Sequence, residues 1–411
     1  MIRGSRSSDA RRRNDLLTTV CTFGLKKFGW IFGGFLVWCI MFLIRDDGEN
    51  LYVLDEPTNP EQSLRLDADE SNSWCSRVSD ARSNLDPSLS ISYPCEGMPH
   101  ATSAIVCYLT AGVEVGKESK AVFSGRDYVN GALALGASLQ KHLTRPDTHR
   151  LLLIREGFSI PDDDKSNLEA VGWTIGKAPI VKIEERFTPR FQRYKTTYTK
   201  ISAIGLSEYK CALLIDADTL AIGSLDDLLS CDILDRPEYH VAGTLDLYHN
   251  RWLHFNTGSI LWRTSTEEMN RVYKLTSDDT FMKRFESDQI FLNNVYPDRT
   301  DKENNLKILD DAEGVTKDSW GVVARLPWGY NAQTHVEVQL QDYWTKNLAD
   351  VRIIHYTEKK GWQCPETYKP PTAEEMAGKC TKKDHSDPIC FCFEGYRWWN
   401  FLREAKGKGG S

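Results

Sequence analysis

The sequence of 411 residues lacks the short motifs of several common enzyme classes. It contains no G-x-x-x-x-G-K-[ST] phosphate loop, no H-E-x-x-H zinc motif, no G-x-S-x-G nucleophile elbow and no Cys-x-x-Cys pair. These absences argue against P-loop nucleotide hydrolases, zincin proteases, serine hydrolases of the α/β type and thioredoxin-like redox proteins. Asn-x-Ser/Thr glycosylation sites are also absent, which slightly weakens the lumenal location predicted below.

A net positive charge is missing from most of the chain. The first 27 residues carry seven basic and two acidic side chains, a net charge of +5, whereas the whole chain has a formal net charge of −7. The remaining residues therefore carry −12. A nucleic-acid-binding protein would show a basic face, so this composition argues against that class and fits a domain that holds a cation.

Only one apolar run is long enough to cross a membrane. Phe28 to Ile44 contains no charged residue and, as a helix, would span roughly 26 Å, close to the roughly 27 Å hydrocarbon core of an early secretory membrane. Basic residues precede the run, and Arg45-Asp46-Asp47 follows it without a small-residue cleavage site. We therefore predict an uncleaved signal anchor rather than a cleaved signal peptide, with residues 1–27 cytosolic and the bulk of the chain lumenal.

The chain after this anchor divides by composition into three parts. Residues 45–119 are polar, with scattered Pro, Ser, Asn and Asp, and are predicted to form a stem. Trp74 and the nearby cysteines suggest that the distal part of this stem packs on another part of the protein. Residues 120–370 alternate strand and helix patterns, which predicts an α/β domain with a mostly parallel central sheet covered on both faces. Residues 371–411 are rich in Cys and Trp and are predicted to be a C-terminal extension.

The patterns also predict individual elements. The expected strands are Lys120–Phe123, His149–Glu156, Cys211–Ile215, Val351–Tyr356 and, after a turn, the segment Phe255–Arg263. The expected helices are Asn130–His142, Asp162–Val171, Lys200–Glu208 and Ser287–Tyr296, with Ser287 as the N-cap of the last.

Nine of the eleven cysteines lie beyond the apolar run. A lumenal, oxidising setting favours disulfides, but their pairing cannot be deduced from one sequence. Zinc binding by Cys380, His385, Cys390 and Cys392 is an alternative on spacing alone. The oxidising compartment makes disulfides the preferred interpretation.

Two aspartates directly follow a buried strand pattern. Ala212 to Ile215 are apolar, and Asp216 and Asp218 come next. The period of two in a strand lets both carboxylates reach one cation, and Mg²⁺ or Mn²⁺ binds carboxylate oxygens while keeping positions open for phosphate. Ligands of parallel sheets lie beyond the carboxyl ends of strands. The alternative is a solvated turn, because D-x-D is common by chance.

Other polar residues could join this site, each with an ordinary alternative. Lys200 precedes Asp216 by 16 residues and could return towards phosphates, or it could be a solvated helix charge. His355 ends an apolar strand pattern and could complete a metal site, or it could be a core histidine bonded to backbone. Asp288 and Gln289 could bind sugar hydroxyls, or they could cap a helix at the surface.

Five sequence blocks, in order, resemble glycosyltransferase family 8, the glycogenin-like retaining transferases. The resemblance runs from about Lys120 to Trp362. The blocks are Tyr128–Leu139, Thr199–Leu229 with its lysine and D-x-D, Phe255–Trp262 (FNTGSILW), Asp288–Asn293 (DQIFLN) and His355–Trp362 (HYTEKKGW). Any one block would be a weak signal, whereas five in the family's order are specific.

The resemblance implies a nucleotide-diphospho-sugar transferase fold of GT-A type, a UDP-sugar donor and Mn²⁺, with Mg²⁺ as an alternative. It implies that Asp216, Asp218 and His355 are the metal ligands. Tyr128 would lie near the uracil. The implied activity is retaining transfer of a hexose, of glucose type or glucuronic acid, to a glycan or related acceptor.

The resemblance also implies roles around the diphosphate and the sugar. Lys200 would offset charge on the leaving group, and Lys360 would lie near the diphosphate and sugar. The residues implied to line the sugar and acceptor side are Asn256, Thr257, Gly258, Asp288 and Gln289. For the retaining step, Asp288 and Gln289 are the candidates, and the choice between a same-face internal return and a covalent intermediate stays open.

The chain departs from the family pattern at three positions. Glu358 stands where the family commonly has Gly, Gly361 where it commonly has Pro, and Thr257 where it commonly has Ser or Ala. These changes bear on Lys360 and on the donor, for which glucose, galactose and glucuronic acid all stay candidates. The acceptor, its linkage and the oligomeric state are also open.

The predicted anchor suggests a further difference from soluble glycogenin. It resembles the arrangement of Golgi-resident members, so we predict a single-pass type II enzyme of the Golgi membrane. A catalytically silent lumenal glycan-binding or scaffold protein with the same fold is the alternative from another class. A second alternative is an enzyme that hydrolyses the donor to UDP and free sugar.

Overall fold

The computed structural model describes residues 68–110, 125–187, 196–237, 239–248, 251–282, 287–296, 322–366, 392 and 394–408. The predicted anchor and the predicted strand Lys120–Phe123 lie outside these ranges. Within the described residues, no helix has the length and apolar character needed to span a bilayer. Residues Leu66–Ser411 form one compact unit.

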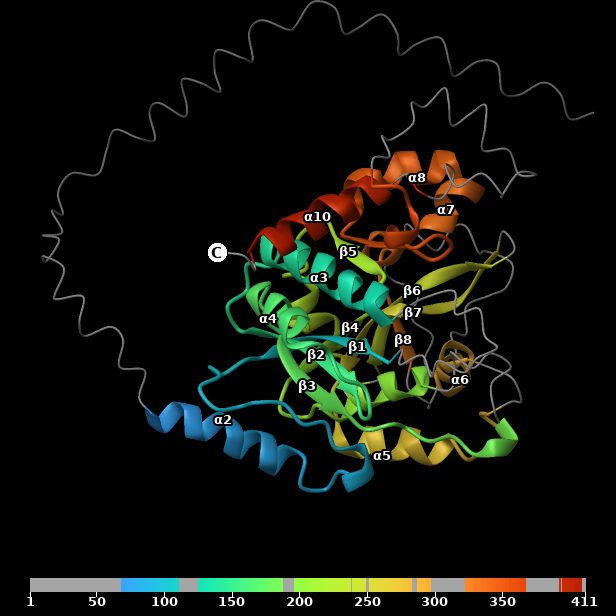
Figure 1. The fold of residues 1–411 in the computed structure, drawn as a ribbon. Coiled ribbons are helices and arrows are strands. Elements are labelled where there is room, and N and C mark those ends of the chain that lie inside the picture. Colours follow the sequence, from blue (N-terminus) through green and yellow to red (C-terminus); the bar gives the residue numbers. More distant parts are fainter. Residues whose placement is uncertain are drawn as a thin grey trace, which may run out of the picture. The chain divides into compact units, whose positions relative to one another are not determined.

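A seven-stranded sheet with the order β3-β2-β1-β4-β7-β6-β8 forms the centre of this unit (Figure 1). Its strands are β1 Ser103–Leu109, β2 Thr148–Arg155, β3 Thr174–Ala178, β4 Cys211–Ile215, β6 Tyr239–Tyr248, β7 Arg251–Arg263 and β8 Val322–Arg325. The pairs β3–β2, β2–β1, β1–β4 and β6–β8 are parallel, whereas β7 is antiparallel to both β4 and β6. The predicted α/β fold with a mostly parallel sheet is therefore confirmed.

A second, three-stranded sheet has the order β5-β10-β9. Its strands are β5 Thr219–Ala221, β9 Ala332–Gln333 and β10 Ile353–His355. The predicted strand Val351–Tyr356 thus exists in shortened form, but it lies in this small sheet rather than the large one. Because β5 begins directly after the D-x-D segment, this sheet extends from the carboxyl end of β4.

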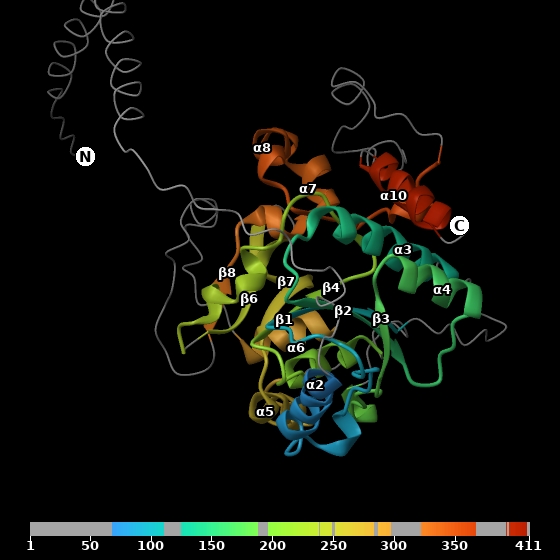
Figure 2. The ribbon, with the colours of Figure 1, turned by 90° about the vertical axis from the view of Figure 1, so that its left-hand side faces the viewer.

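Helices cover both faces of the large sheet (Figures 1 and 2). The α-helices are α2 Ala68–Ala81, α3 Gly125–His142, α4 Asp162–Ala170, α5 Thr266–Leu275, α6 Asp288–Val295, α7 Thr334–Gln339, α8 Gln341–Asn347 and α10 Gly395–Lys408. The 3₁₀-helices are Pro87–Leu89, Glu185–Phe187, Thr197–Gly205, Leu228–Ser230, Asp232–Leu234, Trp328–Asn331, Leu348–Asp350 and Gly361–Gln363. One core cluster joins α3, α4 and α10 to the sheet, and another joins α5, α6 and the Thr197–Gly205 segment to its other face.

The structure confirms most of the predicted elements and changes two. The predicted helices at 130–142, 162–171 and 287–296 are present as α3, α4 and α6, and the strand predicted at 149–156 is β2. The predicted helix Lys200–Glu208 is instead a 3₁₀-helix that begins and ends three residues earlier. The strand predicted within Phe255–Arg263 is confirmed as part of β7, but the turn predicted before it is wrong, since β7 begins at Arg251 and runs unbroken through Phe255.

The predicted stem, residues 45–119, extends too far into the folded domain. β1, within that range, lies in the middle of the large sheet and is buried at all seven positions. Trp74 is fully buried in the core cluster on the α5 side, which confirms that the distal part of this range packs on the domain. The stem prediction is wrong for these residues because β1 is short and polar segments flank it, although its continuous apolar run is typical of a strand covered on both faces.

The described part of the predicted C-terminal extension, residues 392 and 394–408, packs onto the domain. α10 lies along α3 and next to α4 (Figure 2). The ring of Phe401 is 5.6 Å from the Lys141 ammonium and 6.3 Å from the His142 ring, both at the end of α3. Trp398, Leu402 and Ala405 are buried in the same core cluster as α3.

Three disulfides connect described cysteines: Cys75–Cys95, Cys211–Cys231 and Cys364–Cys392. Cys107 in β1 is a buried thiol. The disulfide of Cys392 contradicts the zinc alternative, because this sulfur is already bonded to Cys364. The other residues of that alternative, Cys380, His385 and Cys390, lie outside the described ranges.

Candidate active site

The D-x-D segment connects the two sheets, and its backbone is fixed from both sides. The Asp216 amide donates to the Gly258 carbonyl on β7 at 2.8 Å. The Asp218 carbonyl accepts from the Tyr356 amide, just after β10, at 3.0 Å. α3 approaches closely at Ala217: a Cβ on Gly131 would lie 2.3 Å from the Ala217 oxygen. The two carboxylates therefore stand on a rigid turn at the end of a buried strand.

Asp216, Asp218 and His355 each offer one ligand atom, and these atoms lie within 4.8 Å of one another. The antiparallel pairing of β10 with β5 sets His355 opposite Thr219, one residue after Asp218. Two carboxylates and one imidazole form a donor set suited to Mn²⁺ or Mg²⁺. The structure thus brings the three predicted metal ligands together.

The orientation of the His355 ring fits a metal ligand. Its Nδ1 is 3.0 Å from the Asn331 amide oxygen, and its Nε2 is 3.6 Å from Asp218. Such a hydrogen bond on one ring nitrogen commonly orients the other towards a metal. Burial lowers the pKa of His355 to about 4, so the imidazole is neutral near pH 7, as metal binding requires.

Gly258 makes room for this ring. A Cβ at this position would lie 2.1 Å from His355 Cε1 and 2.9 Å from its Nε2, closer than atoms can pack. The glycine was predicted to line the sugar side, and the structure shows that it also permits His355 to reach the D-x-D segment. Any side chain here would push the imidazole away from the carboxylates.

Two lysines contact the aspartates. Lys200 Nζ is 2.6 Å from Asp216 Oδ1 and 4.0 Å from Asp288 Oδ2. Lys360 Nζ is 2.5 Å from Asp218 Oδ2 and also donates to two backbone carbonyls. Both ammonium groups are largely buried, with side chains 12% and 13% exposed, so the ordinary reading of Lys200 as a solvated helix charge is wrong.

Burial and the lysines act in opposite directions on the pKa values of this cluster. Burial raises the pKa of Asp216, although Lys200 opposes the effect. Burial would also raise the pKa of Asp218, but Lys360 and His355 bring it below its ordinary value. The pKa of Lys200 is raised, because Asp216 and Asp288 outweigh the effect of burial.

Asp288 and Gln289, at the start of α6, lie against β7. Thr257 connects the two elements: its hydroxyl is 3.4 Å from Asp288 Oδ2, and its amide donates to Gln289 Oε1 at 3.2 Å. Asn293, one turn further along α6, bonds both the amide and the carbonyl of Phe255. Asp288 is buried, and Ser287 does not cap the helix through its side chain.

Asn256 is linked to His355, one of the three candidate metal ligands, through a residue that the sequence did not indicate. Its Oδ1 accepts from the Gly258 amide at 2.8 Å and from Asn331 Nδ2 at 2.9 Å. Asn331 in turn bonds His355. No sequence signal pointed to Asn331, because it lies 24 residues before His355 and outside the recognised blocks.

A second missed group surrounds Gln289. Asp246 on β6 accepts from Gln289 Nε2 at 2.8 Å, and His335 Nε2 is 3.8 Å from Asp246 Oδ1. His335 Nδ1 is 2.8 Å from the Thr357 hydroxyl, two residues after His355. These contacts connect Gln289, which follows Asp288, to Thr357, which lies two residues after the candidate metal ligand His355.

Tyr128, in the first turns of α3, lies on the other side of the D-x-D segment. Its ring is 5.1 Å from that of Trp362 in an edge-to-face arrangement. Trp362 also lies beside Gly131, where α3 contacts Ala217. The structure therefore places all the predicted site residues around one segment, while the role of each stays a prediction.

No family model matches the chain. The chain is 25% identical over 236 residues to inositol phosphorylceramide glucuronosyltransferase 1 of Arabidopsis thaliana, covering 57% of this chain and 40% of that relative. It is also 25% identical over 286 residues to glycogenin-1 of Homo sapiens, covering 67% of this chain and 68% of that one. Among solved structures, the glycosyltransferase GlyE of Streptococcus pneumoniae TIGR4 matches with a TM-score of 0.39 and 15% identity, over 75% of this chain and 64% of GlyE.

The chain thus spans less than half the length of the first of these relatives. One of these two relatives is named as a glucuronosyltransferase and the other is a glycogenin. The resemblance drawn from the sequence is confirmed to this extent: the chain is similar to a glycogenin and to a glucuronosyltransferase.

Proposed function

We propose that the protein is a retaining, Mn²⁺-dependent transferase that moves a hexose, of glucose type or glucuronic acid, from a UDP-sugar to a glycan or related acceptor. The observation that carries the proposal is the convergence of Asp216, Asp218 and His355 beside two buried lysines. Mg²⁺ is the alternative ion, because the same oxygen and nitrogen donors accept it.

The charge of the cluster supports a divalent cation and an anionic ligand. Three carboxylates, Asp216, Asp218 and Asp288, face two ammonium groups. With all five ionised and His355 neutral, the cluster carries −1, and the raised pKa of Asp216 reflects the cost of that buried charge. A divalent cation changes the balance to +1, which suits a bound diphosphate.

In the proposed reaction, different residues stabilise the leaving diphosphate and the sugar when the bond between them breaks. A metal ion bound by the three ligands would supply Lewis-acid stabilisation of charge on the leaving diphosphate. The Lys200 ammonium contacts Asp216 and the Lys360 ammonium contacts Asp218. Both ammonium groups therefore lie beside the proposed position of the leaving diphosphate. Asp288 and Gln289 face the sugar side, and both stay candidates for stabilising the sugar cation or attacking it.

Their surroundings differ, which makes the two candidates separable. Asp288 is a carboxylate 4.0 Å from the Lys200 ammonium. The Gln289 amide is held at both ends, by the Thr257 amide and by Asp246. A covalent intermediate on either side chain would be detected by mass spectrometry of protein trapped with a slow donor.

The proposal is tested by UDP release. The purified chain is incubated with a panel of UDP-sugars, with and without Mn²⁺, and UDP is measured. We expect release that needs the metal, favours one donor and rises with a suitable acceptor. Folded protein that releases no UDP from any donor would contradict the proposal, and release that never depends on an acceptor would favour hydrolysis.

A catalytically silent glycan-binding protein of the same fold is separated by Asp218→Asn. An enzyme loses turnover while staying folded, whereas a binding protein keeps its affinity for the glycan. We further propose a Golgi membrane location with a single type II anchor. The basic first residues, the apolar run Phe28–Ile44 and the disulfides support this proposal.

A further inference from the structure

Lys360, five residues after His355, contacts one of the candidate metal ligands, Asp218. Lys360 Nζ contacts Asp218 at 2.5 Å and donates to the carbonyls of Tyr356 at 2.8 Å and Thr357 at 3.2 Å. Its backbone continues into the short 3₁₀-helix Gly361–Gln363, where the Gln363 side chain accepts from the Lys360 amide. These contacts are local, and so short a helix needs outside support to hold one position.

The start of α10, together with Cys392 and Glu394 just before it, provides this support through three direct links. The Tyr356 hydroxyl donates to the Glu394 carbonyl at 2.9 Å. Trp399 Nε1 donates to the Cys364 carbonyl at 2.8 Å. Cys364 is also joined covalently to Cys392 by a disulfide. The segment 356–364 is therefore connected to α10 at both of its ends.

Trp398 supports the middle of the same segment. Its indole is fully buried, and a Cβ on Gly361 would lie 2.3 Å from Trp398 Cγ. The ring thus packs directly on the backbone next to Lys360, and it lies 5.9 Å from Trp362. Glycine is the residue with the greatest backbone freedom, so the order of this position comes from the indole above it.

The rest of α10 is tied to the helical layer over the sheet. Phe401 packs against Lys141 and His142, and Leu402 and Ala405 are buried. α10 therefore connects the Lys360 segment to α3, the same helix that contacts the D-x-D segment at Ala217. Lys360 and Asp218 are held against each other through one continuous packed layer.

We propose that the start of α10, through Trp398 and the Cys364–Cys392 disulfide, is a positioning device for Lys360, and that it sets the affinity for the donor diphosphate. The inference rests on the proposed function, because Lys360 needs an anionic ligand to act on. The disulfide acts through Lys360 and does not itself contact the reacting groups. Reducing this bond therefore weakens nucleotide binding.

The test uses the full chain with Cys364→Ser and Cys392→Ser together. The matched control removes Cys75–Cys95, a disulfide of similar sequence separation (20 against 28 residues) that lies away from the metal cluster. We expect the Kd for UDP in the presence of Mn²⁺, measured by calorimetry, and the KM for the donor to rise roughly tenfold, about 1.4 kcal/mol. The expected change in kcat is smaller, and the control changes neither constant.

A double-mutant cycle with Lys360→Met shows whether the effect passes through this lysine. If it does, loss of the disulfide has little further effect in the Lys360→Met background. An equal loss in both backgrounds would overturn the inference, because it would show a general structural role. Trp398→Phe, which keeps an aromatic ring in place, is the second probe if the serine pair does not fold, and it should shift the same constants in the same direction.

The wild-type measurement judges the proposed function separately. A wild-type chain that neither binds UDP with Mn²⁺ nor releases it from any donor contradicts the proposed function. The inference about α10 alone is contradicted if the wild-type chain both binds and releases UDP and the two variants keep its constants. These constants are the Kd for UDP and the KM for the donor, measured for the disulfide variant and for Trp398→Phe.

Discussion

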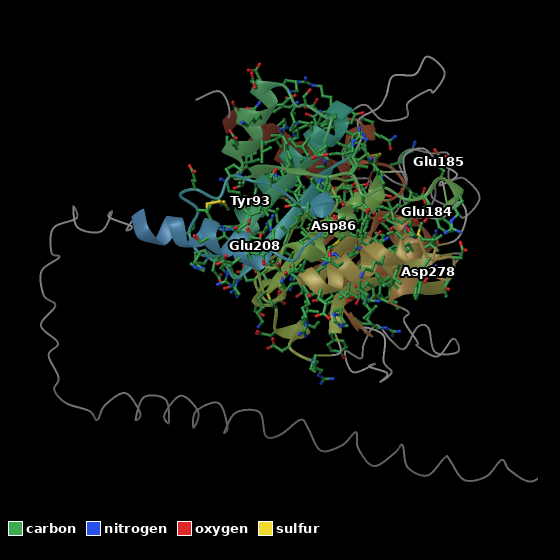
Figure 3. The ribbon with its side chains drawn as sticks, turned by 90° about the horizontal axis from the view of Figure 1, so that it is seen from below. Asp86, Tyr93, Glu184, Glu185, Glu208 and Asp278 are labelled. Atoms are coloured by element: carbon green, nitrogen blue, oxygen red, sulfur yellow. A yellow bond between two sulfur atoms is a disulfide. The ribbon has the colours of Figure 1, made fainter. Side chains whose placement is uncertain are left out.

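Two clusters of buried charge lie at the two ends of β4 and differ in how completely they are paired. Before the strand, Glu208 is fully buried and forms an ion pair with Arg82. Glu208 also accepts from Tyr93 at 2.7 Å, and Figure 3 shows these two residues near each other. After the strand, Asp216 and Asp218 stand with His355 and the two lysines.

In the first cluster the Glu208 carboxylate is fully paired, and we call this cluster the closed pair. Arg82 Nε donates to one oxygen of Glu208 at 2.9 Å, its terminal nitrogen pairs with the other, and the Glu208 carbonyl accepts from Arg77. One charge of each sign is matched with good geometry, which is what makes a buried pair tolerable. The second cluster has three carboxylates for two lysines, and its ligand atoms converge on one point.

This difference distinguishes a cluster that stabilises the fold from a cluster suited to binding a ligand. A closed pair needs nothing more and contributes by holding α2 and its following segment to the sheet. A buried cluster in which carboxylates outnumber lysines, and in which burial and charged neighbours shift the pKa values, is typical of a binding or catalytic site. The comparison predicts that mutations before β4 change stability, whereas mutations after it change ligand binding.

The largest expected effect is on stability, from Arg82→Met. The substitution leaves Glu208 buried without its charged partner, and breaking one side of a buried pair costs about 3–5 kcal/mol. Urea unfolding with intact disulfides should show a lower midpoint, while the KM for the donor of the folded fraction stays unchanged. Adding Glu208→Gln should recover part of the loss. An unchanged midpoint for Arg82→Met would show that the closed pair does not stabilise the fold.

Asp218→Asn should have the largest effect on catalysis. Losing a charged metal ligand should reduce metal-dependent UDP release roughly 100-fold or more. The unfolding midpoint should change little. Asp226→Asn is the control, because Asp226 bonds Thr144 and lies outside the cluster. Equal activity of the two variants would contradict the assigned metal site.

Gly258→Ala should weaken metal binding without removing a ligand. The added methyl would lie 2.1 Å from His355 Cε1, so the ring must move. Displacing an oriented ligand typically costs 10–100-fold in metal affinity. Calorimetric titration with Mn²⁺ measures the effect, with Gly407→Ala as control because nothing lies within 4 Å of its added Cβ. Unchanged affinity would show that His355 does not bind the metal.

The smallest expected effect is a dependence of stability on pH at the closed end. His149 lies beside Trp74 and 2.9 Å from the Tyr209 hydroxyl. Burial lowers its pKa from 6.5 to about 4. Between these values the unfolded chain binds a proton that the folded chain does not, so stability decreases as pH falls through this window.

The measurement compares Tm at about pH 7 and about pH 5 for the wild-type chain and for His149→Gln. The variant should lose less Tm on acidification, because it lacks the buried imidazole. An equal loss in both would assign the pH dependence to other groups.

The identity of the candidate site residues was more predictable from the sequence than the contacts that bring them together. The D-x-D segment followed from a local pattern, because four apolar residues before two acids indicate a buried strand with carboxylates at its end. The 3₁₀ form of Thr197–Gly205 was not predictable, since both helix types share apolar spacing over so short a segment. Asn331 and Asp246 left no signal, because neither lies near the motif whose residue it contacts.

The amino-acid sequence by itself determined the locally encoded features: the buried strand before Asp216, the helices α3, α4 and α6, the alternation typical of an α/β fold and the identity of the candidate ligands. These depend on contacts between neighbours along the chain. Only the tertiary structure decided that β1 belongs to the sheet, which cysteines pair, that His355 reaches Asp218 through β5 and β10, and that α10 supports Lys360. These depend on pairings between distant segments, where burial and strand register choose among arrangements that look equivalent in the sequence.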